Sequence, residues 1–85
     1  MSISEILDRV LNPFTECLTA EAAQKIVDFR ADRITQNRID ELAAKSSSGQ
    51  LSVEERSEYQ EYIHTFDLVA IVKSKARAVL ARLGT

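Results

Sequence analysis

Apolar residues recur at helical spacing near the start of the chain, which predicts a short amphipathic helix. The apolar positions of this stripe are Ile3, Ile6, Leu7, Val10 and Leu11. Ser2 and Glu5 have the spacing of a capping box, and Asn12-Pro13 is predicted to end the helix because Pro disfavours a helical residue before it. A helix this short is unstable alone in water. We therefore expect residues 1–18 to form an arm that docks on the domain or on another chain.

Two candidate caps precede apolar positions in the middle segment, residues 19–48. Thr19 stands before one apolar stripe, and Asp32 stands before a second. The stripe slips between Phe29 and Ile34, which favours a break near Asp32, but one continuous helix over residues 20–45 stays open. Three serines and Gly49 close the segment, since serine is a weak helix former and glycine accepts the left-handed conformation past a helix end.

A long helix is predicted over residues 52–83. Ser52 and Glu55 form a capping box, and neither Pro nor Gly occurs between positions 53 and 83. Acidic residues gather in its first part and basic residues in its last part, which matches the dipole of one helix roughly 45 Å long. The weakest stretch is residues 64–67, where Asp67 could cap a new start.

The long helix carries a seven-residue repeat of mostly apolar positions, the a/d pattern of a helix that packs along another helix. This seam consists of Tyr59, Tyr62, Phe66, Val69, Lys73, Ala76, Leu80 and Leu83. Val72 and Val79 flank the seam and Ile71 lies nearly opposite, so the helix is apolar on more than one side.

The other helices of a short chain can cover one side of this helix, and a second copy of the chain can cover the other side. We therefore predict a coiled-coil-like homodimer or a partner protein helix; the alternative is a monomeric bundle with this helix as its spine. The predicted partner contacts are Tyr59, Tyr62, Phe66, Val69, Ile71, Val72, Leu80 and Leu83.

Length and composition fit this picture. The 85 residues suffice for one small domain, and 45% hydrophobic with 28% charged residues is the balance of a soluble globular protein. We therefore expect an all-α fold over residues 1–85: a small bundle with a short N-terminal helix, one or two middle helices and a long C-terminal helix. The single cysteine and the lack of a signal-like or membrane-spanning apolar run favour a cytoplasmic protein without membrane contact.

One candidate metal motif occurs on the long helix. Glu61 and His64 have the Glu-x-x-His spacing of di-iron bundles, and Glu41 or Glu21 could supply further carboxylates in a homodimer. With the tyrosines on the seam, however, Glu61 and His64 fall on the far side of the helix. We therefore favour a solvated histidine and predict no metal site.

Catalysis has little support in the sequence. Cys17 has the acidic Glu16 beside it rather than the cationic neighbour that a reactive thiol needs. No catalytic triad order, glycine-rich phosphate loop or paired-cysteine metal spacing occurs. We predict no enzyme, no cofactor and no small-molecule substrate.

A small basic group offers a nucleic-acid alternative. Arg30, Arg33 and Arg38 lie close together in the sequence, and a dimer would bring two sets together. Acidic neighbours such as Asp32 and Asp40, and a net charge of −2, favour ordinary ion pairs over a phosphate track.

The stretch from Thr19 to Leu80 resembles short bacterial proteins of no assigned activity. The resemblance rests on the segment Gly49 to Ile63 and on the basic helix around Lys73 to Arg77. It implies an all-helical fold in a bacterial cytoplasm and assigns no catalytic residue. Our first hypothesis is a helical protein–protein interaction module of the adaptor or inhibitor type. A dimeric nucleic-acid-associated regulator is the alternative, and a metal-binding bundle the third.

Overall fold

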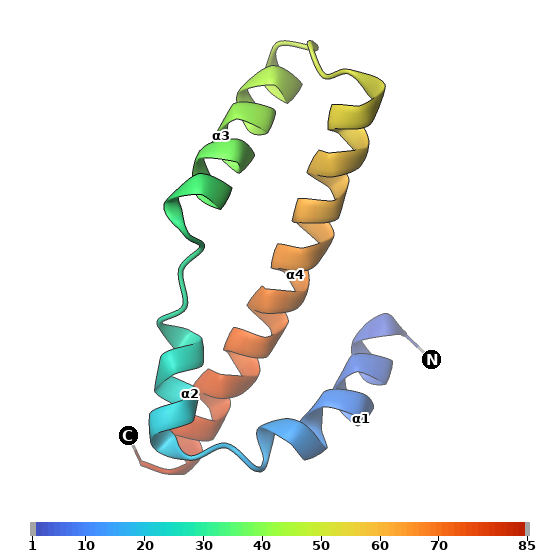
Figure 1. The fold of residues 1–85 in the computed structure, drawn as a ribbon. Coiled ribbons are helices and arrows are strands. Elements are labelled where there is room, and N and C mark those ends of the chain that lie inside the picture. Colours follow the sequence, from blue (N-terminus) through green and yellow to red (C-terminus); the bar gives the residue numbers. More distant parts are fainter. Residues whose placement is uncertain (1, 85) are drawn as a thin grey trace. The chain divides into compact units, whose positions relative to one another are not determined.

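Four α-helices make up the part of the chain that the structure, a computed structural model, describes: residues 2–84 (Figure 1). They are α1 (Ile3–Thr15), α2 (Ala20–Val27), α3 (Arg33–Ser47) and α4 (Val53–Arg82). No strand occurs in this range. The predicted all-α fold class, with a short first helix and a long last one, is therefore confirmed. No helix within residues 2–84 combines the length and the apolar character that crossing a membrane requires.

Side-chain caps fix the starts of the two middle helices. The Thr19 hydroxyl accepts from the backbone N–H of Ala22 at 3.1 Å, and Asp32 Oδ1 accepts from the N–H of Thr35 at 2.8 Å. Each cap satisfies a backbone donor that the first turn of a helix leaves without an internal partner. Residues 20–45 thus form two helices, with the break near Asp32 that the slip in the apolar stripe favoured.

The start of α4 is a complete capping box. The N–H of Glu55 donates to Ser52 Oγ at 3.0 Å, and the N–H of Ser52 donates back to Glu55 Oε1 at 3.1 Å. From there α4 continues for 30 residues, through Asp67 without a break. Gly84, beyond its end, has the positive φ of 77° that glycine adopts without strain.

The end of α1 corrects one prediction. Asn12-Pro13 does not end this helix, because Pro13 lies inside it and the helix continues to Thr15. Pro13 lacks the N–H that would bond to the carbonyl of Arg9, and its ring crowds that carbonyl, but it lies only two residues before the end of the helix. The next donors are still in place, since the N–H of Glu16 bonds to the carbonyl of Asn12 at 2.9 Å.

The contacts within the chain divide into two compact units. Unit 1 combines the described residues up to Phe29 with those from Val69 onward. Its core is formed by four buried residues, with partly buried residues of the 18–27 stretch packed against them. The core residues are Ala23, Ala76, Val79 and Leu80. Apolar side chains of α2 and α4, two of them alanines, therefore form the core of this unit.

The first helix is also part of unit 1. Lys75 Nζ donates to Asp8 and, at 2.8 Å, to Asn12 Oδ1, and Leu7 and Ile71 line a shared hollow. One edge of α1 therefore contacts α4 within unit 1. Its other edge remains exposed, with the apolar residues Ile3, Ile6, Val10 and Phe14.

Unit 2, Arg30–Leu68, is an antiparallel helical hairpin. It consists of α3 and residues 53–68 of α4, which lie side by side (Figure 1). The loop between them turns at Gly49, whose φ of 69° lies in the left-handed region. Leu42 is the one large side chain in the described residues that is fully buried. The core of this unit is therefore small.

Candidate protein-interaction surface

Ion pairs join the two helices on one side of the hairpin, and a hollow of about 380 Å³ lies beside them, lined by Glu58, Tyr62 and Phe66 among others. Arg38 Nε and Nη2 donate to the two carboxylate oxygens of Glu58 at 2.9 and 2.8 Å. Arg38 Nη1 also donates to Glu41 at 2.9 Å, and Lys45 Nζ donates to Glu55 at 2.6 Å. A two-pronged guanidinium–carboxylate pair fixes geometry better than a point charge does. These pairs join α3 to α4 and hold the two helices in register.

The same contacts change the acidity of the carboxylates. The hydrogen bond from Lys45, with the backbone bond from Ser52, lowers the pKa of Glu55 from 4.5 to about 2. The hydrogen bond from Arg38 lowers the pKa of Glu58. Glu55 therefore stays ionised, and bound to its partner, well into the acid range, and the pairing with Arg38 favours the ionised form of Glu58.

Acid is predicted to weaken unit 2 through Glu55. Its pKa in the folded chain is below the unfolded value, so its contribution to stability is complete above about pH 4.5 and is lost as the pH falls towards 2. The change Glu55→Gln should lower the melting temperature at pH 7 and make it less dependent on pH, so that the two curves converge near pH 2. Melting followed by circular dichroism from pH 7 to 2 measures this.

The matched control is Glu54→Gln, since Glu54 is exposed and has no ion-pair partner among residues 2–84. This variant should keep the pH dependence of the parent chain. Equal slopes for Glu55→Gln and the parent would show that the Lys45 pair does not contribute to stability.

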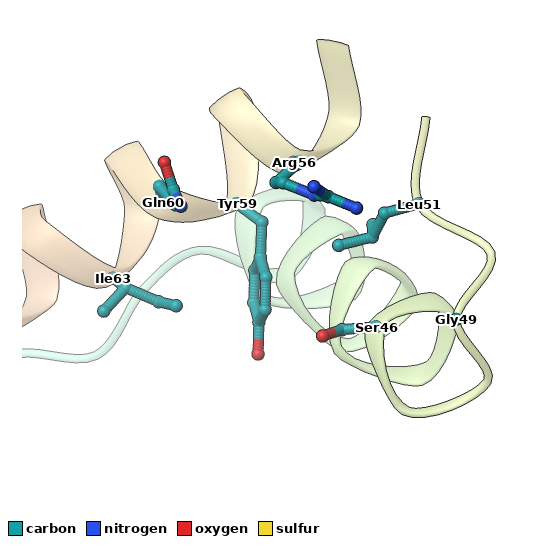
Figure 2. A pocket seen from close by; sticks show the side chains of 7 residues that line it. All are labelled: Ser46, Gly49, Leu51, Arg56, Tyr59, Gln60 and Ile63. Atoms are coloured by element: carbon teal, nitrogen blue, oxygen red, sulfur yellow. The ribbon is translucent and has the colours of Figure 1, made fainter. Parts of the chain in front are cut away.

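The opposite side of the hairpin is apolar and open, and we call it the Ile63 face. Two adjoining hollows of about 330 and 300 Å³ share Tyr59 and Ile63 as lining residues. Figure 2 shows the Tyr59 ring between Ile63 on one side and Arg56 and Leu51 on the other. The remaining lining residues of the two hollows are Gln36, Ile39, Ser46, Gly49, Gln60, Tyr62, Phe66 and Asp67. Ile63 is 42% exposed, so apolar surface stays in contact with water here.

Two opposite charges lie on the rim of the Ile63 face. Arg56 lines one hollow and Asp67 lines the other. Neither side chain has an ion-pair partner within residues 2–84, whereas Arg38 and Lys45 on the other side are fully engaged. The two sides of this hairpin therefore differ in how their charges are paired.

The predicted seam has its helical neighbours within the same chain. Tyr59, Tyr62 and Phe66 are half-buried and share a hollow with Gln36 and Ile39 of α3. In unit 1, Ala76 and Leu80 lie in the core with residues of the 18–27 stretch. The seven-residue repeat thus marks a stripe that this chain covers in part with its own helices.

The remaining predicted contact residues lie in unit 1. Val69, Ile71 and Val72 are half-buried, and Leu83 is 50% exposed. Leu80 is buried in the core of unit 1. Its side chain is thus occupied within the chain, and it is not part of the surface proposed below.

The arginine group is divided by the structure. Arg38 is bound to Glu58 and Glu41, so its charge is neutralised locally. Arg33, at the start of α3, is exposed and has acidic Asp32 before it. Arg38 is therefore occupied within the chain, and no observation favours the nucleic-acid alternative.

The residues with metal or thiol chemistry do not form a site. Glu61 and His64 are both exposed on α4. No group of three or more His, Cys, Asp or Glu side chains that could hold a metal ion occurs in the described part of the chain. Cys17 is exposed, and its thiol donates to the carbonyl of Pro13 at 3.3 Å.

Sequence reasoning did not include Ile39 and Ile63 among the contact residues. Ile63 lies four positions after Tyr59 and three before Phe66, so it borders the seam. The signal for Ile63 in the sequence was that the apolar stripe is wider than its a/d positions. Spacing alone does not tell which of the residues flanking those positions another helix covers.

Comparison of the chain with protein-family models, with curated proteins and with solved structures finds no match. The function is therefore inferred from the groups that the fold brings together.

Proposed function

We propose that this protein is a helical protein–protein interaction module that associates with a second copy of itself through the Ile63 face. The observation that supports this most directly is the contrast between the two sides of the hairpin. One side carries the Arg38 and Lys45 ion pairs, with a single hollow beside Glu58. The other side has two adjoining hollows that share Tyr59 and Ile63, and the charges at their edges have no ion-pair partner within residues 2–84. Aromatic residues are enriched in interfaces, while most charged residues are depleted at interface centres.

The small core of unit 2 favours a second copy as the occupant. One fully buried large side chain contributes little for a hairpin of this length, and small domains often gain the missing burial by oligomerising. Two antiparallel hairpins that meet along their apolar faces form a four-helix bundle, a common and stable arrangement. A module of this kind acts by assembling chains, as an adaptor or as an inhibitor does.

Replacing Ile63 with Asp tests the proposal. In a symmetric dimer the change enters the interface twice, and each copy loses apolar burial and gains a charge that must be desolvated. We expect the dissociation constant to rise by at least roughly 100-fold. Sedimentation equilibrium over a wide range of protein concentration measures it.

The matched control is Ile34→Asp, which puts the same charge on α3 at a side chain that is 83% exposed and lines neither hollow. It should leave the dissociation constant unchanged, and circular dichroism should show native helix content for both variants. A parent chain that is monomeric at every concentration would contradict the proposal, as would equal effects of the two substitutions.

A further inference from the structure

We infer, on the basis of the proposed self-association, that the two copies lie antiparallel, with Arg56 of each α4 paired to Asp67 of the other. The inference concerns orientation and register, which the apolar contacts alone leave open. A groove lined by Tyr59, Ile63 and Phe66 accepts a helix in either direction. Charges on the rim are what distinguish one direction from the other.

The first step is the geometry of one edge of α4. Arg56, Gln60, Ile63 and Asp67 follow at spacings of four, three and four residues, so they lie in a row along one edge of the helix. All four line the hollows of the Ile63 face. The row is positive at its first residue and negative at its last, with Gln60 and Ile63 between them. The charges are about 17 Å apart along the axis.

The second step is symmetry. In a two-fold interface, if one residue meets a second, the second also meets the first. An axis that crosses α4 between Gln60 and Ile63 brings Arg56 of each copy to Asp67 of the other and places each Ile63 beside Gln60 of the other. Two ion pairs then frame an apolar centre. A parallel alignment of the two α4 helices instead places like charges together.

The third step is that both charges are available. Within the described residues Arg56 and Asp67 have no ion-pair partner, unlike the basic residues on the other side of the hairpin. Gln60 is exposed and Ile63 is 42% exposed, so the described residues leave the centre of the row open to water. A second copy supplies both the missing charge partners and the missing apolar cover.

Charge reversal tests the register. Arg56→Asp and Asp67→Arg should each weaken the dimer about tenfold at low salt, because each puts like charges together at two places in the interface. The effects should shrink at high salt, where rim charges are screened. In the double variant, with both changes in one chain, the acid at position 56 of each copy again meets the base at position 67 of the other, so both ion pairs form with their charges exchanged. Its dissociation constant should therefore lie within about threefold of the parent value.

Mixing the two single variants gives a second readout. A chain with Arg56→Asp carries two acids in the row, and a chain with Asp67→Arg carries two bases. Pairing of one with the other restores both ion pairs, so native mass spectrometry of the mixture should show mainly the heterodimer. This result places the two charges in the interface, whereas the orientation is tested by the single variants, which weaken an antiparallel dimer and leave a parallel one unchanged. A statistical mixture of homodimers and heterodimers would overturn the inference.

Arg33→Asp is the matched control, since Arg33 is an exposed arginine near the other end of the hairpin from the loop. It should leave the dimer unchanged. Suppose instead that Arg33→Asp weakens the dimer and that the double charge-reversal variant does not regain the parent affinity. Each Asp67 then meets α3, not α4, of the second copy. That result would overturn the antiparallel register, while sensitivity to Ile63→Asp would leave the proposed function standing. A parent chain that never dimerises would refute both.

Discussion

Replacing Leu42 with Ala is expected to lower the free energy of unfolding of unit 2 by about 2–5 kcal/mol. Leu42 is 0% exposed, and it is the largest fully buried side chain in the described part of the chain. Its removal loses the transfer free energy of the deleted atoms and leaves a cavity that the neighbouring side chains fill only in part. A chain of this size is stable by only about 4–13 kcal/mol, so the loss is a large fraction of the total.

Denaturation by urea, followed by circular dichroism, measures this loss. Hydrogen exchange then locates it: the amides of α3 and of residues 53–68 should lose more protection than those of α2. Ile34→Ala is the control, because Ile34 lies on the same helix and is 83% exposed. It should change stability by less than about 0.5 kcal/mol. If Leu42→Ala lowered the free energy of unfolding by no more than Ile34→Ala does, the hairpin would have no packed core.

The sequence predicted the helices of this protein because their start signals are local. Thr19, Asp32 and Ser52 each bond to a backbone N–H three residues ahead, so the cap and its partner lie in one short segment. The same locality explains the break near Asp32, where the cap and the slip in the apolar stripe agreed. Pro13 was misjudged because its cost depends on where it lies in the helix, and the residue pattern did not show that the helix continues for two residues beyond it.

Contacts between helices were harder to predict. Arg38 was grouped with Arg30 and Arg33 because they are near in sequence, but its carboxylate partner Glu58 is 20 residues away. Only the antiparallel hairpin brings the two side chains together. The grouping by sequence distance therefore suggested a basic patch where the fold forms an ion pair.

The seam shows the same limit in apolar terms. Periodicity identified a stripe that must be covered, and the structure covers much of it with helices of the same chain. What the stripe cannot specify is the identity of the neighbour, since a helix of the same chain and a helix of a second copy satisfy the same spacing. The open surface lies at the border of the stripe, where Ile63 adds apolar area beyond the a/d positions.

Overfilling the core of unit 1 is the second change with a large expected effect. Ala23 of α2 and Ala76 of α4 are both 0% exposed in one cluster. Side chains this small let two helices approach closely, so Ala76→Leu has no space for its added atoms and must push neighbouring groups apart. We expect a loss of about 1–3 kcal/mol in the free energy of unfolding.

Ala78→Leu is the matched control, because Ala78 lies on the same helix two residues further and is exposed. Leucine favours helices nearly as well as alanine, so this control should stay within about 0.5 kcal/mol of the parent. Urea denaturation of both variants, with hydrogen exchange of the α2 amides, separates steric strain from helix propensity. If Ala76→Leu were as stable as Ala78→Leu, then α2 and α4 would not be in the close contact on which the core of unit 1 depends.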